Sequence, residues 1–162
     1  MVNVLTGDSS TELFGGEVPP LAKQLLEQVR TAGSPERVLA LLWTAQISAP
    51  QCPSLYYLLY KFYARQADFE QAELVALKGL AVAAQQSHLP DDWRTVTSDI
   101  ADFTSPGPAR LWLFTLKALA FIRLRHDDSK SATAYLDKVI HLDPEGGTGA
   151  GVIESLINGS RT

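Results

Sequence analysis

Apolar residues recur every three or four positions along most of the chain, a spacing that places side chains on one face of an α-helix. Alternation with period two, which is typical of strands, never persists for long. The pattern predicts an all-α protein. Helices are expected over residues 21–29, 35–49, 54–66, 69–86, 111–125, 129–142 and 152–157.

Capping residues and prolines mark where these helices begin and end. Ser34 followed by Pro35 supplies an N-cap and a proline at the first helical position. Asp68 stands three residues before Gln71, which is the spacing of a capping box. Pro50, Pro53 and Pro144 remove amide donors and end the preceding helices.

Glycines, prolines and short polar residues also divide the chain into regions. Residues 1–18 mix glycines with short polar residues and are expected to form a mobile arm. Residues 19–158 form one domain and residues 159–162 a tail. Between residues 87 and 112, prolines and aspartates interrupt the helical spacing of apolar residues. This loop-rich insertion carries Trp93, Ile100, Phe103 and Trp112, so we expect it to fold back on the body as an ordered lid or elbow.

Three stretches share a 34-residue spacing of large, small and proline positions. The third, residues 113–146, fits the pattern best, and only Arg123 departs from it where an aromatic residue is expected. Residues 53–86 fit with Tyr60 in place of a small residue, and residues 19–52 form a degenerate copy. The matching residues of the third copy are Leu116, Leu119, Ala120, Ala132, Leu136 and Pro144.

This spacing resembles the tetratricopeptide repeat family. The resemblance implies three helical hairpins plus a capping helix, with the insertion breaking the array between the second and third copies. Residues 56–63, 89–94 and 113–118 also resemble stretches of small bacterial tetratricopeptide proteins encoded among nitrogen-fixation genes.

In that family the first helix of each hairpin lines a concave binding face, and here six of the fifteen corresponding positions are basic and one is acidic. The known clamp for two carboxylates is absent, because Glu27, Leu58, Phe114 and Ala118 occupy its positions. The resemblance implies a basic groove in which Phe114 is a further apolar anchor. The partner-binding residues expected in it are Lys23, Arg30, Tyr57, Lys61, Arg65, Lys117, Phe121 and Arg125.

Overall charge adds little to this picture. The formal net charge is −4 and the pI about 5.3, so the whole molecule has no field that would draw it to nucleic acid or an anionic membrane. Cys52 is the only cysteine, and no basic leader or long apolar run is evident. We therefore expect a cytoplasmic protein.

A catalytic or metal site is not expected. His88, His126 and His141 lack the paired spacing of metal ligands on a helix, and an acidic turn beside His88 is more often structural. No histidine lies near Cys52 in sequence to activate it, and the glycines of residues 146–151 lack the lysine of a phosphate loop. No cofactor is implied.

The expected function is therefore a non-catalytic protein-interaction module, an adaptor or an assembly factor of chaperone-like type. It would bind an acidic, partly apolar segment, because arginine pairs with carboxylates while aromatic side chains supply buried area. The alternative is a structural protein that self-associates into a homo-oligomer through apolar end faces near Leu21 or Val152. Binding of single-stranded nucleic acid is a third, less favoured reading.

Overall fold

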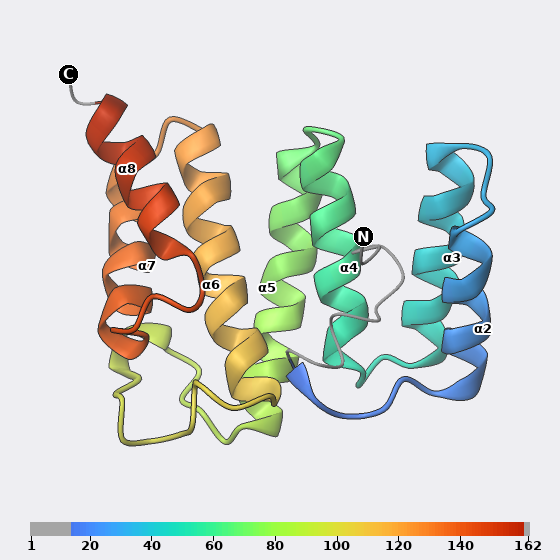
Figure 1. Ribbon diagram of the computed structural model, residues 1–162, viewed down its shortest axis with the longest axis horizontal. Helices are drawn as coiled ribbons and strands as arrows, with labels where there is room; N and C mark the ends of the chain where they lie inside the picture. The colour runs from blue at the N-terminus through green and yellow to red at the C-terminus, as the bar shows by residue number, and fades with distance from the viewer. Residues whose placement is uncertain (1–13, 161–162) are drawn as a thin grey trace.

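A computed structural model describes residues 14–160, and over this range the chain forms seven α-helices and no strand. Figure 1 shows the helices side by side in chain order. The all-α prediction is confirmed. The helices are α2 (Pro20–Val29), α3 (Pro35–Ser48), α4 (Pro53–Arg65), α5 (Phe69–Gln86), α6 (Pro108–Arg125), α7 (Ser129–Leu142) and α8 (Ala150–Ser160).

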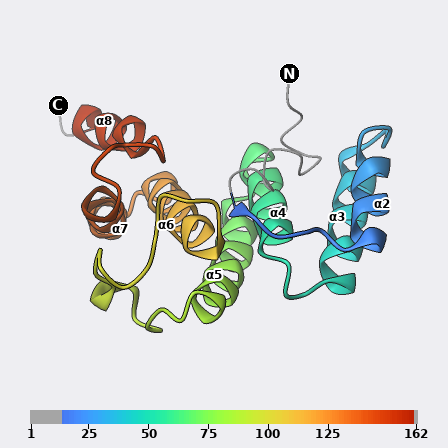
Figure 2. The same ribbon diagram turned by 60° about the horizontal axis from the view of Figure 1, so that its bottom comes forward.

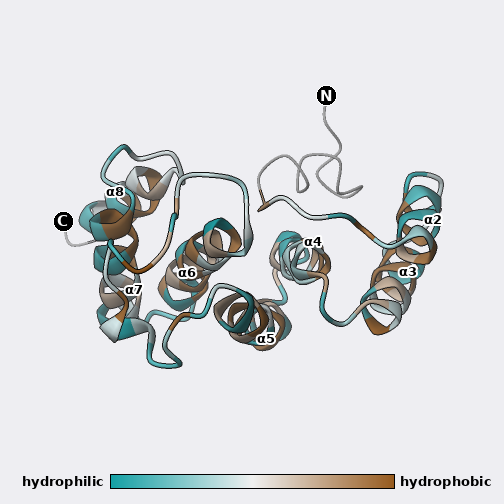
Figure 3. Cartoon of the chain, turned by 90° about the horizontal axis from the view of Figure 1, so that it is seen from below, coloured by the Kyte–Doolittle hydropathy of each residue, from teal (hydrophilic) through white to brown (hydrophobic). Residues whose placement is uncertain are grey.

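Neighbouring helices pack as three hairpins, α2 with α3, α4 with α5, and α6 with α7. The second hairpin packs on the third through α5 and α6, and α4 also contacts α6 (Figure 3). Helix α8 packs on α7 and α6 at the end of the row. Helix α6 begins three residues before the expected Leu111, because Gly107 and Pro108 provide a helix start there.

The second and third hairpins turn in the same way. Ala67 and Asp127, sixty residues apart in the sequence, both have φ of 58° and follow the last turn of their helices. The next amide in each turn, that of Asp68 or Asp128, donates to the carbonyl five residues earlier at 2.9 Å. The two hairpins therefore share one helix-ending motif.

Side-chain caps begin the second helix of each hairpin. The Ser34 hydroxyl accepts from the Arg37 amide at 3.2 Å, and the Asp68 carboxylate accepts from the Gln71 amide at 3.2 Å. Both predicted caps are confirmed. Asp128 does the same for α7.

The core runs through the hairpins, and α4 and α5 approach each other closely at Gly79. A Cβ atom placed on Gly79 would lie 2.7 Å from the Cβ of Tyr56, so only glycine fits at this point. Trp112, Tyr60 and Leu116 are among the largest fully buried side chains. Within residues 14–160, no helix combines the length and the apolar character needed to cross a bilayer.

The insertion packs beneath α5, α6 and α7 at one end of the row (Figures 1 and 2). A short 3₁₀ helix, Trp93–Thr95, places the indole of Trp93 on the ring of Tyr135, with centroids 4.7 Å apart. Val96 is fully buried, and Phe103 contacts Trp112. The insertion is thus ordered, as expected.

One side chain of the insertion does not follow the expectation. We expected Ile100 to pack on the body, but it is 43% exposed and follows a turn between the buried Val96 and Phe103.

Candidate functional site

A pocket of about 550 Å³ opens between α4, α6 and α8. Its wall is mainly apolar and aromatic, with three cationic side chains. No residue of the insertion lines it, so the insertion does not cover this face. The lining residues are Tyr57, Tyr60, Lys61, Ala64, Arg65, Phe114, Lys117, Ala118, Phe121, Ile122, Gly149, Val152 and Ile153.

Helix α4 supplies one wall through a stripe of side chains four residues apart. Tyr57, Lys61 and Arg65 repeat at this interval and therefore share one helical face. The Lys61 ammonium lies 5.5 Å from the centre of the Tyr57 ring, within the range of a cation–π contact.

Helix α6 supplies the opposite wall. Phe114, Lys117 and Phe121 stand three and four residues apart, so they also share one face. The Lys117 ammonium lies 5.1 Å from the centre of the Phe114 ring. Each wall therefore combines aromatic rings with cations.

The cations of this pocket repel one another. Burial lowers the pKa of Lys61 and the neighbouring Arg65 lowers it further. Burial also lowers the pKa of Lys117, with added repulsion from Lys61 and Arg110. No aspartate or glutamate of the described residues lines the pocket or forms an ion pair with Lys61, Arg65 or Lys117. An anion entering the pocket would relieve this repulsion.

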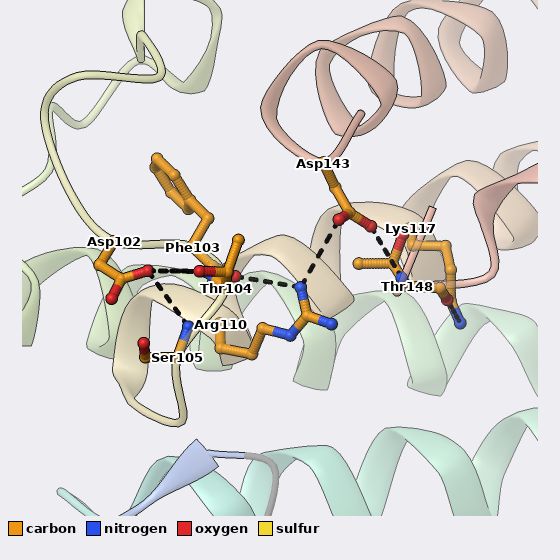
Figure 4. A network of polar contacts seen from close by, with 8 residues as sticks. All are labelled: Asp102, Phe103, Thr104, Ser105, Arg110, Lys117, Asp143 and Thr148. Atoms are coloured by element: carbon orange, nitrogen blue, oxygen red, sulfur yellow. Dashed lines mark hydrogen bonds and ion pairs between the residues drawn. The ribbon is translucent and has the colours of Figure 1, made fainter. Parts of the chain in front are cut away.

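A polar network links Lys117 through Thr148 to Asp143 and Arg110 (Figure 4). Arg110 donates to the Phe103 carbonyl at 3.0 Å and lies 3.8 Å from the carboxylate of Asp143. Asp143 in turn accepts from the Thr148 amide at 2.7 Å. Lys117 donates to the Thr148 carbonyl at 2.7 Å. The network ties the insertion and the loop before α8 to α6.

Helix α8 closes the side of the pocket next to α6. Ile153 is buried against the core, whereas Val152 is 67% exposed at the rim. Because the loop before α8 is held by Asp143, the position of both side chains depends on the network around Arg110. The predicted capping helix thus also forms a wall of the site.

Phe14 packs against two of the rings that line the pocket. Its ring meets Tyr57 edge-on at 5.0 Å and Phe114 at 5.4 Å, and the side chain is only 3% exposed. The expected mobile arm, residues 1–18, therefore includes a buried side chain. Residues 1–13 lie outside the described residues.

The structure brings five of the predicted binding residues into one pocket: Tyr57, Lys61, Arg65, Lys117 and Phe121. The other three lie elsewhere.

Arg125, the last residue of α6, lines an adjoining hollow with Phe121 and lies over the Phe69 ring at 5.2 Å. Lys23 and Arg30 are exposed at α2 and do not line the pocket. Helix α2 packs on α3 and is separated from α6 by the second hairpin, which explains why the first copy does not join this site.

Sequence reasoning missed several contributors. Tyr60 replaces a small residue of the repeat pattern and reaches towards α6, and Val152 and Ile153 come from the capping helix. Phe14 was assigned to the arm. Its aromatic character within a polar stretch was the one signal that could have indicated a docked side chain.

Other reactive side chains form no comparable site. Cys52 is half-buried, and burial raises the pKa of its thiol, which disfavours the thiolate. Within the described part of the chain, no three histidine, cysteine, aspartate or glutamate residues are grouped as metal ligands would be.

Comparison of the sequence and the structure with protein-family models, with curated proteins and with solved structures finds no match.

Proposed function

We propose that this protein is a non-catalytic interaction module that binds an acidic, partly apolar segment of a protein partner in the pocket between α4, α6 and α8. The observation that carries the proposal is the grouping of Lys61, Arg65 and Lys117 among aromatic side chains, without a carboxylate of the described residues beside them. The role would be that of an adaptor or of a chaperone-like assembly factor, consistent with the resemblance to tetratricopeptide repeats.

The pocket chemistry supports a ligand with two kinds of group. A carboxylate would be held by Arg65, whose planar fork pairs with both oxygens, and by Lys61 one turn away. An apolar side chain would lie against Phe121 and Ile153. A ligand with only one of these groups would contact either the cations or the apolar side chains of the pocket, but not both.

The proposal is tested by selecting ligands from a displayed library of random peptides. The wild-type protein should enrich peptides that combine aspartate or glutamate with a large apolar residue. A Lys61→Glu, Arg65→Glu variant should lose these peptides, because its reversed charges repel them. Circular dichroism would first confirm that both proteins are folded.

A matched control reverses two exposed lysines on other helices. The Lys78→Glu, Lys130→Glu variant changes the net charge by the same amount but leaves the pocket intact. It should select the wild-type peptides. If the two double variants select the same peptides, the pocket is not the binding site.

A second candidate, self-association, is favoured by apolar side chains that are exposed at both ends of the row. Leu21 and Ile47 are 57% and 73% exposed on the first hairpin, and Leu156 is 49% exposed on α8. An end face of this kind is buried when a second copy covers it. Sedimentation of Leu21→Glu and Leu156→Glu variants tests it: smaller assemblies than wild type support self-association, and a monomeric wild type excludes it.

A further inference from the structure

Lys61 is a half-buried amine in a pocket that offers it no acceptor. Its ammonium group lies over the Tyr57 ring, 5.5 Å from the ring centre. Among the described residues, no carboxylate pairs with Lys61 and no hydrogen bond reaches its ammonium group. Lys117 differs, since it donates to the Thr148 carbonyl at 2.7 Å. Of the two pocket lysines, Lys61 is therefore the one whose nitrogen can react without giving up a bond.

The groups that face Lys61 favour its neutral form. Arg65 on α4 and Lys117 on α6 are cationic, and none of the α8 residues that line the pocket is charged. Burial raises the pKa of Tyr57, so its phenol adds no negative charge. Burial and the charge of Arg65 lower the pKa of Lys61. At pH 7 a larger share of Lys61 than of an exposed lysine is thus the neutral amine, which has the lone pair that attacks carbonyl carbon.

The rest of the pocket suits a small molecule with an acidic end. Its volume of about 550 Å³ lies within the range of small-molecule sites, about 300–1,000 Å³. Phe121 and Ile153 offer apolar surface to the body of such a molecule. Arg65 stands one turn beyond Lys61, about 6 Å along the helix axis, and its planar fork can pair with both oxygens of a carboxylate. A ligand held by Arg65 would present its other end to Lys61.

We infer that Lys61 forms an imine with a small aldehyde that carries a carboxylate at its other end. The Lys61 nitrogen attacks the carbonyl carbon and forms a C–N bond, while the π pair of the carbonyl moves to oxygen. The oxygen takes up a proton and the nitrogen releases one. The resulting carbinolamine loses its hydroxyl group as water: the hydroxyl takes up a proton, the nitrogen releases its second one, and its lone pair forms C=N. No oxidant, reductant or protein partner is needed, so this activity goes beyond the proposed function.

The experiment uses 4-formylbenzoate, which carries an aldehyde and a carboxylate at opposite ends of a benzene ring. The full chain is incubated with this probe at pH 7, and cyanoborohydride reduces any imine to a stable secondary amine. Mass spectrometry of peptides then measures the labelling of each lysine. Lys61 should be labelled about tenfold faster than Lys78, which is exposed on α5. Equal rates at Lys61 and Lys78, or faster labelling of Lys117 than of Lys61, would overturn the inference.

The dependence of labelling on pH and on folding shows whether the pocket activates the amine. The ratio of the Lys61 rate to the Lys78 rate should fall between pH 7 and pH 10, because Lys78 also loses its proton as the pH rises. In concentrated urea the two lysines should react alike, since the pocket is lost. A ratio that does not fall with pH, or that survives in urea, would overturn the inference.

The acidic end of the ligand is tested with the methyl ester of the probe, which keeps the ring and the aldehyde but has no charge. Relative to Lys78, Lys61 should react several-fold more slowly with the ester than with the acid, because Arg65 holds only the acid. Lys78 corrects for the different intrinsic reactivity of the two aldehydes. If the acid and the ester label Lys61 equally on this scale, the ligand carries no acidic end and the inference is wrong.

A variant of Arg65 tests its part directly. Arg65→Met removes both the carboxylate partner and a charge that disfavours the protonated amine, so the labelling of Lys61 by the acid should slow several-fold. Arg37→Met, at an exposed position on α3, removes the same charge far from the pocket and should leave the rate unchanged. Circular dichroism checks that both variants are folded. Equal rates in the two variants would overturn the role of Arg65.

Competition separates this activity from the proposed function. An acidic peptide selected from the displayed library should protect Lys61 from the probe, because both occupy the same pocket. Preferential labelling of Lys61 without such protection supports the reactive amine and contradicts the proposed function. Peptide selection that depends on Lys61 and Arg65, without preferential labelling of Lys61, supports the proposed function and overturns the reactive amine.

Discussion

The phenol of Tyr60 on α4 lies 3.3 Å from the hydroxyl of Thr115 on α6, and both groups are buried. The Thr115 hydroxyl also lies 2.8 Å from the Leu111 carbonyl, which can only accept. The single proton of the threonine therefore goes to Leu111, and Tyr60 donates to Thr115. Burial raises the pKa of Tyr60, which keeps the phenol protonated and able to donate. This bond joins two consecutive hairpins.

The direction of that bond predicts unequal effects of removing its two partners. Thr115→Val leaves the Tyr60 hydroxyl buried without a partner, and such a group costs about 1–3 kcal/mol. Tyr60→Phe removes the donor and leaves a threonine that still donates to Leu111, so the cost should be about 1 kcal/mol. Urea denaturation of both variants measures the free energies of unfolding.

The double variant completes the cycle. Tyr60→Phe with Thr115→Val should be less destabilised than the sum of the single changes, because neither polar group of the pair remains unsatisfied. Additive effects would mean that the two hydroxyls do not interact in the folded protein.

A side chain at Gly79 should destabilise the protein, because this residue lies at the contact of α4 with α5. A Cβ atom there would stand 2.7 Å from the Cβ of Tyr56, which cannot rotate away because it is attached directly to the backbone. Gly79→Ala gains about 1 kcal/mol of helix propensity. Overpacking costs about 1–3 kcal/mol, so the variant should be less stable than wild type by thermal or urea denaturation.

Gly151 supplies the control, since it lies in α8 with open space around its Cα. Gly151→Ala should leave stability unchanged or raise it slightly. A Gly79→Ala protein as stable as the Gly151→Ala protein would show that the helices can separate at this point without cost.

The helices were predictable because each carries its own signals. The Ser34 and Asp68 caps, the prolines, and the spacing of apolar residues are local features, and the helices follow them to within a few residues. The meeting of the two pocket walls was also predictable, because the repeat register makes Tyr57 and Lys61 of the second hairpin equivalent to Lys117 and Phe121 of the third, and all four line the pocket.

The remainder of the site depends on contacts between segments that are distant in sequence. Nothing near Phe14 in the sequence indicates that its ring will meet Tyr57, 43 residues later. The wall formed by Val152 and Ile153 depends on the bond between Asp143 and Thr148, which sets the loop before α8. Such contacts are decided by packing, which the local pattern does not encode.

We expect that loosening the insertion changes its own susceptibility to proteolysis but not ligand binding in the pocket. Lys138 on α7 donates to the carbonyls of Arg94 and Val96 at 2.8 Å each, and Trp93 stacks on Tyr135. Trp93→Ala should therefore loosen the insertion and speed limited proteolysis after Arg94, several-fold or more, because that bond becomes accessible more often.

The control for this prediction is Ile100→Ala, since Ile100 is exposed and its loss should not change the cleavage rate. Binding of an acidic peptide selected from the displayed library should be the same in wild type and in Trp93→Ala, because no insertion residue lines the pocket. A weaker peptide affinity in Trp93→Ala would show that the insertion shapes the pocket after all.

Because Lys61 is partly buried, we expect the free energy of unfolding to depend on pH. Its pKa in the folded protein is lowered from 10.5, mainly by burial, so the folded state holds this proton less tightly than the unfolded state does. Stability rises with pH wherever the unfolded state binds more protons. The destabilising contribution of Lys61 is therefore fully present below its lowered pKa and is lost as the pH rises to 10.5.

Removing the charge should reveal this contribution. Lys61→Met keeps the apolar stem without the ammonium group, so the variant should be more stable than wild type at pH 7, and the difference should shrink by pH 10. Other groups titrate in both proteins and cancel in the difference. Lys78→Met, at an exposed position on α5, should show no such trend in urea denaturation at the two pH values. If Lys61→Met is less stable than wild type at pH 7, the ammonium is paired in the free protein, and the pocket is not poised for an anion.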